Sequence, residues 1–334
     1  MTLTDNPLEK YDLTFGTSLA PAEIHVKSPF KGFFRSLPEK FFLRINEVPV
    51  LHQHLLMHYF YSLRESYDLC FSAYNEMDLG ECGIQYFHDK PGSCIGPLLV
   101  QRIFGYSNMR MQNNISLVPS AWMARRVEAA YGMESMVVYP PVRSVFPAKD
   151  WTERVNGFLC VARFSPEKRI EKAIEIIAQV RKNGFDVSLR IVTLGGKANY
   201  ERHIRKRCAD HGNWIHIDQD LTNDQYVRLL SEYRYYLNAS KNEGFGIAIF
   251  EAINAGCIPF VLGSGGQQEG LDQYTEFIFN KTNKAIKVIS EILKSENLQK
   301  AALQKLFLLR GHFSVDRFRA EIMNITNDFF EKDL

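Results

Sequence analysis

The sequence lacks the long apolar runs of a membrane-spanning helix, because no window of 18 residues is apolar throughout and free of charged side chains. A spanning helix needs about 20 predominantly apolar residues. An N-terminal signal pattern is missing as well, which argues against secretion. These absences predict a cytoplasmic protein, and peripheral contact with the inner face of a membrane stays open.

Cysteine pairs with metal-binding or redox spacing are also missing. The chain has six cysteines with no Cys-x-x-Cys motif, and several lie in apolar runs, as expected for reduced, buried thiols. Neither sign of charge is in excess, with 40 basic and 38 acidic residues, so that nucleic acid is not an expected partner.

The chain does have enough length and apolar content for two cores, with 334 residues of which 46% are hydrophobic. Short apolar runs alternate with longer segments of helical periodicity, which predicts an α/β fold with parallel sheets. The strands are expected at 157–162, 187–192, 214–217, 235–238 and 257–262, and the helices between them at 169–183, 200–211 and 224–233. Two amphipathic helical stretches are expected beyond Ile286, the last one from Val315 to Phe330.

The segment Asn242–Ala252 places two glutamates around a Gly-Phe-Gly turn that opens a helix. Gly244 and Gly246 let the chain bend tightly, and the positive end of the helix dipole faces the same point. A diphosphate would bind there, while the carboxylates of Glu243 and Glu251 could accept hydrogen bonds from sugar and ribose hydroxyls. The predicted strand just before this turn puts it where an open α/β sheet binds ligands.

Three further motifs accompany these glutamates, and together they resemble retaining glycosyltransferases of family 4. They are Val161–Arg169, Gly265–Glu269 and Val138–Val142, and they occur in the family's order and spacing. A looser similarity of Gln85–His88 points within the family to mannosyltransferases that act on lipid-linked oligosaccharides.

The resemblance implies the GT-B fold, with two Rossmann-like domains that face a cleft. The expected boundaries are 1–147 for the acceptor-side domain, 148–312 for the nucleotide-sugar domain, and 313–334 for a helix that packs back on the first domain. The region Phe146–Asn156 is the expected linker. Because Tyr11–Phe15 resembles the family's second strand, the first domain is expected to lack its opening strand and helix.

The resemblance also implies roles for individual residues. Arg163 and Lys168 would stabilise the charge on the leaving nucleotide without metal. Glu243 would contact the transferred sugar, Glu251 the ribose, and His88 the donor sugar near the reacting carbon. The backbone would hold the phosphates at Gly244, Phe245, Gly246, Gly265, Gly266 and Gln267. The alternatives are solvated charges at a helix start for Arg163 and Lys168, a flexible loop at 265–269, and a histidine that merely ends a strand.

Two other patterns have alternative explanations. His54 and His58 share a helix face at i, i+4 spacing with His52 nearby, but the surrounding apolar residues favour a core-facing or interfacial helix over a metal site. Phe30–Arg35 and Lys40–Arg44 interleave basic and aromatic residues, which suits either a membrane interface or packing inside the first domain.

The sequence therefore predicts a retaining, metal-independent hexosyltransferase that needs no cofactor beyond its nucleotide-diphosphate sugar donor, with GDP-mannose as the guessed donor. The acceptor would be a hydroxyl of a glycan or a lipid-linked saccharide. A catalytically silent nucleotide-sugar-binding or scaffold protein and a nucleotide-sugar epimerase of the same fold are the rival hypotheses.

Overall fold

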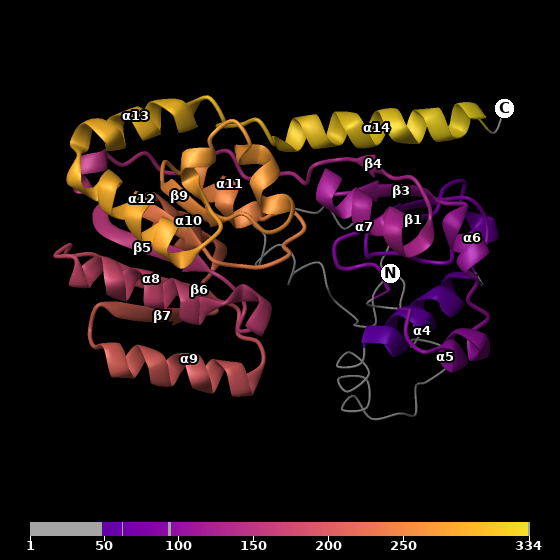
Figure 1. Ribbon diagram of the computed structural model, residues 1–334. Coiled ribbons are helices and arrows are strands. Elements are labelled where there is room, and N and C mark those ends of the chain that lie inside the picture. Colours follow the sequence, from indigo (N-terminus) through magenta and orange to yellow (C-terminus); the bar gives the residue numbers. More distant parts are fainter. Residues whose placement is uncertain (1–48, 62, 93–94, 333–334) are drawn as a thin grey trace. The chain divides into compact units, whose positions relative to one another are not determined.

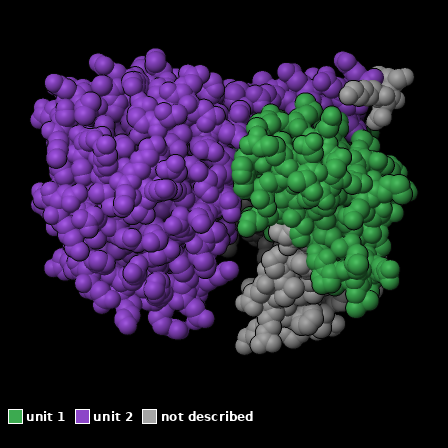
Figure 2. Space-filling view, in the orientation of Figure 1, with its two compact units in different colours: residues 1–138 green, residues 139–334 purple. Residues whose placement is uncertain are grey.

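The computed structural model describes residues 49–61, 63–92 and 95–332, which form parts of two compact units (Figure 2). The first unit comprises residues 1–138 and the second residues 139–334. This division precedes the boundary expected at 147. The physical reason is that the segment after Val138 packs on the second unit: the ring of Tyr139 lies 5.6 Å from that of Phe245, and the Val142 amide donates to the Phe313 carbonyl over 2.7 Å.

The first unit contains a parallel sheet of order β1-β2-β3-β4. Its strands are β1 (Phe71–Ser72), β2 (Ile84–Tyr86), β3 (Ile115–Val118) and β4 (Met136–Val137). Its described helices are α4 (Pro49–Tyr61), α5 (Leu98–Ile103), α6 (Asn108–Gln112) and α7 (Ala121–Tyr131). Tyr11–Phe15, Phe30–Arg35 and Lys40–Arg44, which carried the expectations about a missing first strand and a membrane interface, lie outside the described residues.

The second unit is built on a six-stranded parallel sheet of order β10-β9-β8-β5-β6-β7 (Figure 1). The strands are β5 (Val155–Val161), β6 (Ser188–Thr193), β7 (Ile215–Gln219), β8 (Tyr233–Asn238), β9 (Ile258–Leu262) and β10 (Ile278–Phe279). All five residues of β9 are buried, as expected for a strand with helices on both faces. The predicted strands of this half are confirmed to within two residues at each end.

Helices cover both faces of this sheet because the chain reverses its direction of winding after β7. The connections are α8 (Ile170–Lys182), α9 (Ala198–His211), α10 (Asn223–Glu232) and α11 (Ile247–Asn254). Right-handed crossovers put α8 and α9 on one face and α10 and α11 on the other. The helical periodicity that predicted α8 corresponds to its buried stripe, formed by Ile170, Ala173, Ile174, Ile177 and Val180.

Three helices end the described chain, where the sequence predicted two stretches beyond Ile286. They are α12 (Thr282–Lys294), α13 (Glu296–Phe307) and α14 (Val315–Lys332). Ser295 separates the first two, and its side chain accepts a hydrogen bond from the Leu298 amide, which caps α13. No helix among the described residues is both long and apolar enough to cross a bilayer. The expectation that α14 packs on the first unit stays a prediction.

The winding reverses between β5 and its neighbour β8. At such a switch point the loops after adjacent strands leave in opposite directions, and a crevice opens at the carboxyl ends of the strands. The loops that follow β5 and β8 carry the Val161–Arg169 and Asn242–Ala252 motifs. The fold therefore brings the two motifs to one edge of the sheet.

Candidate functional site

An ion pair joins the two loops at the switch point. Lys168 Nζ, after β5, lies 2.6 Å from Glu243 Oε1, after β8, and both side chains are mostly buried, with 17% and 19% of their surface exposed. Asn238, the last residue of β8, donates from Nδ2 to the second carboxylate oxygen of Glu243 over 3.3 Å. The Lys241 amide also donates to the Glu167 carbonyl over 2.8 Å. These contacts hold an ammonium and a carboxylate in one position at the strand ends.

The loop after β9 is bound to the backbone of Glu243. The Gly266 amide donates to the Glu243 carbonyl over 2.8 Å, and Gly265 and Glu243 form a parallel bridge. Gly265 has φ 138°, and a Cβ there would lie 2.6 Å from the Glu243 carbonyl oxygen and 2.8 Å from its amide nitrogen. Only glycine permits this approach. The predicted grouping of Glu243 with Gly265 and Gly266 is thus present in the structure.

The Gly-Phe-Gly turn presents its backbone and buries its aromatic ring. Gly246 has φ 87° and precedes the first residue of α11, so that the N-terminal amides of this helix lie beside the Glu243 loop. The Phe245 ring is 3% exposed and stacks on Phe250 at 4.7 Å, which fixes the start of the helix from inside. The turn with Gly244, Phe245 and Gly246 can therefore offer backbone donors to an anion.

Glu251 lies on α11 and faces α10. Tyr226, on α10, donates its hydroxyl to Glu251 Oε2 over 2.7 Å. Burial raises the pKa of the Glu251 carboxyl, while the hydrogen bond from Tyr226 and the charge of Arg143 partly oppose that rise. A carboxylate in such surroundings has one fixed donor and is poorly solvated, so that ribose hydroxyls would be suitable further donors.

Arg163 is exposed in the loop after β5, and Lys197 lies in the loop after the adjacent strand β6. The loop after β6 is joined to the loop after β5 because the Lys197 amide donates to the Phe164 carbonyl over 2.7 Å. Partial burial acts to raise the pKa of Glu167, but hydrogen bonds within this loop and the charges of Lys197 and Arg163 outweigh it, so that the pKa is lowered. The joined loops after β5 and β6 thus carry three cationic residues, Arg163, Lys168 and Lys197, beyond the carboxyl ends of these strands.

Gln267 is fully buried, and its side chain is used within the protein. Its Nε2 donates to the carbonyls of Ser240 and Leu262 over 2.9 Å and 3.0 Å. These bonds hold the loop after β9 to the loop after β8. Any contact of Gln267 with a donor phosphate would therefore come through the backbone, as the resemblance implies.

His88 belongs to the first unit and follows β2. The Asn75 side chain positions its loop, since Asn75 Oδ1 accepts hydrogen bonds from the amides of His88 and Asp89 at 2.7 Å each. The His88 ring lies 4.7 Å from that of Tyr86. Although much of the residue is exposed, partial desolvation of the ring lowers the pKa of His88, so that the neutral imidazole is favoured. The role of His88 in a donor site stays a prediction.

His54, on α4, is part of the packing of the first unit. His54 is buried, its Nε2 lies 2.8 Å from the Ile95 carbonyl oxygen, and its ring stacks on Phe104 at 5.3 Å. The core-facing interpretation is therefore confirmed for His54. Cys160, Cys208 and Cys257 are free and buried, as expected, whereas Cys82 is exposed.

Sequence reasoning missed three residues of this site: Asn238, Tyr226 and Lys197. Asn238 ends a strand that leads into the glutamate motif, which is a signal that could have been used. Lys197 follows a Gly-Gly pair after a strand, which is a similar signal. Tyr226 could not be found in this way, because its pairing with Glu251 depends on which helices pack side by side.

The family model of glycosyl transferases group 1 matches residues 143–305, which contain the ion pair, the glycine turns and Glu251. The chain is 25% identical over 266 residues to the GDP-Man:Man(3)GlcNAc(2)-PP-Dol alpha-1,2-mannosyltransferase of Dictyostelium discoideum, covering 71% of this chain and 50% of that protein. It is 28% identical over 176 residues to the enzyme of the same name from Candida albicans, covering 46% and 29%. The chain therefore spans half or less of these relatives.

Solved structures share the fold. The crystal structure of Anabaena Alr3699/HepE in complex with UDP and glucose superposes with a TM-score of 0.68 at 14% identity, covering 82% of this chain and 81% of that one. The crystal structure of TarM superposes with a TM-score of 0.58 at 15% identity, covering 73% and 50%. The chain thus has the GT-B fold, with two Rossmann-like units.

Proposed function

We propose that the chain, whose residues 143–305 match the glycosyl transferases group 1, transfers a hexose from a nucleotide-diphosphate sugar to an acceptor hydroxyl. The acceptor would be a glycan or a lipid-linked saccharide, and the anomeric configuration of the sugar would be retained. The proposal includes a cytoplasmic location, with peripheral contact to the inner face of a membrane where the acceptor is lipid-linked.

The observation that carries this proposal is the Lys168–Glu243 pair at the switch point, 2.6 Å apart and bordered by the Gly265–Gly266 backbone. A diphosphate bound at the amides of the Gly-Phe-Gly turn, beside this pair, would attract Lys168 and Arg163, and this charge would stabilise the leaving nucleotide as the glycosidic bond breaks. The carboxylate of Glu243 would then be available to accept hydrogen bonds from the transferred sugar.

Other residues would hold the two ends of the donor. Glu251 would accept hydrogen bonds from ribose hydroxyls, with Tyr226 fixing the orientation of its carboxylate. His88 would contribute a neutral imidazole that hydrogen-bonds the sugar. No step of this scheme calls for a metal ion or a separate cofactor.

The names of relatives suggest which donors to test. The relatives from Dictyostelium discoideum and Candida albicans are named for GDP-Man, while another, 25% identical over 202 residues, is the UDP-N-acetylglucosamine--peptide N-acetylglucosaminyltransferase GtfA subunit of Streptococcus pneumoniae. We favour GDP-mannose because the mannosyltransferase from Dictyostelium discoideum covers more of the chain, 71% against 59%.

The test is calorimetric binding and acceptor-independent hydrolysis of GDP-mannose, UDP-N-acetylglucosamine and ADP-glucose by the purified chain. We expect one donor to bind selectively and to be hydrolysed slowly, and Glu251→Ala to weaken that binding. Binding without hydrolysis, even with a mannosylated acceptor present, would favour the binding-protein hypothesis. Epimerised donor without acceptor would favour an epimerase, and no binding at all would refute the proposal.

A further inference from the structure

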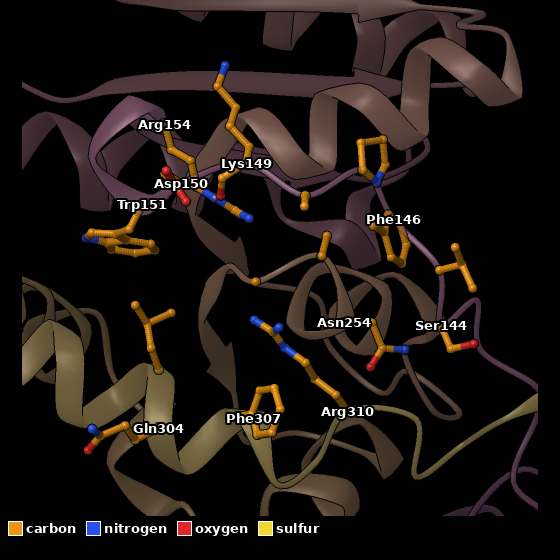
Figure 3. A pocket seen from close by; sticks show the side chains of 16 residues that line it. Ser144, Phe146, Lys149, Asp150, Trp151, Arg154, Asn254, Gln304, Phe307 and Arg310 are labelled. Carbon is orange, nitrogen blue, oxygen red and sulfur yellow. The ribbon is translucent and has the colours of Figure 1, made fainter.

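A cavity of about 770 Å³ lies in the second unit (Figure 3), beside the residues that precede β5 and β9, whereas the candidate site lies at the carboxyl ends of the strands. Trp151 and Arg154 line it just before β5 begins, and Asn254 and Gly256 line it just before β9 begins. Phe307 and Arg310, at the end of α13 and just beyond it, form another wall. Neither the family resemblance nor the proposed transfer reaction assigns a role to this cavity.

Two guanidinium groups meet in the cavity. Nη2 of Arg154 and Nη2 of Arg310 each lie 2.9 Å from the position that a Cβ at Gly256 would occupy. Figure 3 shows the two side chains extending toward one another, whereas Lys149 extends away from them. A glycine at position 256 leaves room for both groups.

The pair is not neutralised by the described part of the chain. None of the ion pairs among described residues involves Arg154 or Arg310. Asp150 lines the cavity, but it is exposed and pairs with neither guanidinium. Desolvation lowers the pKa of Arg154, which is buried, and also that of Arg310, which is more exposed. Cys257 opposes both shifts, and the charge of Arg310 lowers the pKa of Arg154 further.

Contacts within the protein offset only part of the positive charge of Arg154 and Arg310. Arg154 donates from Nε to the Lys149 carbonyl over 3.1 Å and from Nη1 to the Tyr233 carbonyl over 3.4 Å. The C-terminus of α11 is adjacent, yet a helix terminus carries only about half a negative charge. Arg310 lies over the Phe307 ring at 5.3 Å and makes no hydrogen bond from its guanidinium to any described residue. Two full positive charges therefore exceed what the surrounding protein offsets.

We propose that Arg154 and Arg310 form a binding site for the phosphate group of a small molecule, separate from the nucleotide-sugar site. Paired guanidiniums suit phosphate because each can donate two parallel hydrogen bonds to its oxygens. The cavity has room for more than the phosphate, and the Trp151 and Phe307 rings in its lining provide apolar surface for the rest of the ligand.

The experiment measures phosphate binding by the full chain, with inorganic phosphate as the probe and titration calorimetry as the readout. Arg310→Gln is the main variant because Arg310 makes no hydrogen bond that the fold would lose. We expect phosphate to bind about tenfold more weakly to it, as for the loss of one charge-assisted contact. Arg202→Gln, an exposed arginine on α9, is the control with the same change in charge.

Phosphate could also bind at the donor site, so Lys168→Met is titrated in parallel. The proposal requires binding that Arg310→Gln weakens and that Lys168→Met and Arg202→Gln leave in place. Sedimentation with phosphatidic acid vesicles distinguishes a lipid source from a soluble one, since a lipid ligand would give Arg310-dependent sedimentation. Phosphate binding that only Lys168→Met weakens would overturn the proposal. The absence of phosphate binding at millimolar concentration, together with the absence of sedimentation with vesicles, would also overturn it. Phosphate binding to this cavity can be measured whether or not the chain transfers sugar. A failure of this proposal is therefore distinguishable from a failure of the proposed function.

Discussion

At the scale of single residues, Lys168 is held where a leaving diphosphate would need a positive charge. We expect Lys168→Ala to lower acceptor-dependent transfer on the order of 10²-fold or more, because transition-state charge would lose its partner. The free energy of unfolding should fall by only about 1 kcal/mol, since the pair is not fully buried. Transfer kinetics and urea unfolding measure the two effects separately.

The control for this variant is Lys172→Ala, on α8. Lys172 Nζ lies 2.6 Å from Glu175 Oε2, the same distance as in the Lys168–Glu243 pair, but away from the strand ends. This change should leave transfer as in the wild type. Near-normal transfer by Lys168→Ala would remove Lys168 from the reaction.

We expect the carboxylate of Glu251 to lower the stability of the folded state and to contribute to nucleotide binding. Burial raises the pKa of Glu251 above its ordinary value of 4.5, so that the folded state holds the proton over a wider pH range than the unfolded chain does. The free energy of unfolding therefore falls as pH rises through the folded pKa. Glu251→Gln should raise stability at pH 7 on the order of 1 kcal/mol, as for other substitutions that relieve a functional site, while it weakens nucleotide binding.

Thermal unfolding between pH 4 and pH 8 tests this expectation. The gain should disappear below about pH 4.5, where the carboxyl is protonated in both states. Glu171→Gln is the matched control because Glu171 also accepts a hydrogen bond from a tyrosine hydroxyl, that of Tyr200, outside the site. A Glu251→Gln variant that is less stable than the wild type at pH 7 would contradict our account of this carboxylate.

At the scale of elements, the close approach of the loops after β8 and β9 depends on Gly265. We expect Gly265→Ala to lower the free energy of unfolding by about 1–3 kcal/mol. The Cβ of the new alanine would meet backbone atoms of Glu243, which cannot move aside without breaking the bridge. Nucleotide affinity should fall as well, since the Glu243 loop would shift. Urea unfolding and calorimetry provide the two measurements.

Gly184→Ala separates backbone strain from steric contact. Gly184 also has positive φ, at 94°, but a Cβ there would meet nothing within 4 Å. We expect Gly184→Ala to lower the free energy of unfolding by less than Gly265→Ala does, and to leave nucleotide binding unchanged. Equal losses in the two variants would show that the contact with Glu243 has no effect of its own.

Elements of the second unit could be predicted because each has a strong local pattern. The buried stripe of α8 and the apolar run of β9 are examples, since periodicity and burial have the same cause. Strands as short as β1 and β4, with two residues each, have too few side chains to show a pattern. The packing of Tyr139 against Phe245 joins distant parts of the sequence, so that no local pattern shows that the chain from Tyr139 onward belongs to the second compact unit.

The candidate site was predictable where the residues lie in motifs, and less so where they meet across elements. The loops with Lys168 and Glu243 follow strands that are adjacent at the switch point, so that the topology alone places them together. The position of Tyr226 beside Glu251 depends instead on how α10 and α11 pack. The sequence shows that position 226 has a hydroxyl group, but it does not show that this hydroxyl contacts Glu251.

At the scale of the whole molecule, the residues expected to bind the donor nucleotide all lie in the second unit, which has its own sheet and its own core. The core includes buried residues from every strand of this sheet and from its helices, such as Phe158, Ile174 and Phe260. We therefore expect residues 139–334 expressed alone to unfold cooperatively and to bind the nucleotide of the preferred donor within about tenfold of the full chain.

Sugar transfer should be lost in this fragment, because His88 and the remainder of the predicted acceptor side belong to the first unit. Calorimetric titration with the nucleotide, thermal unfolding and a transfer assay on the same preparation check the three parts. The Glu251→Ala variant of the fragment provides the control for specific binding. A fragment that folds but does not bind would mean that the first unit contributes to nucleotide binding, and one that transfers sugar would contradict the role we give to His88.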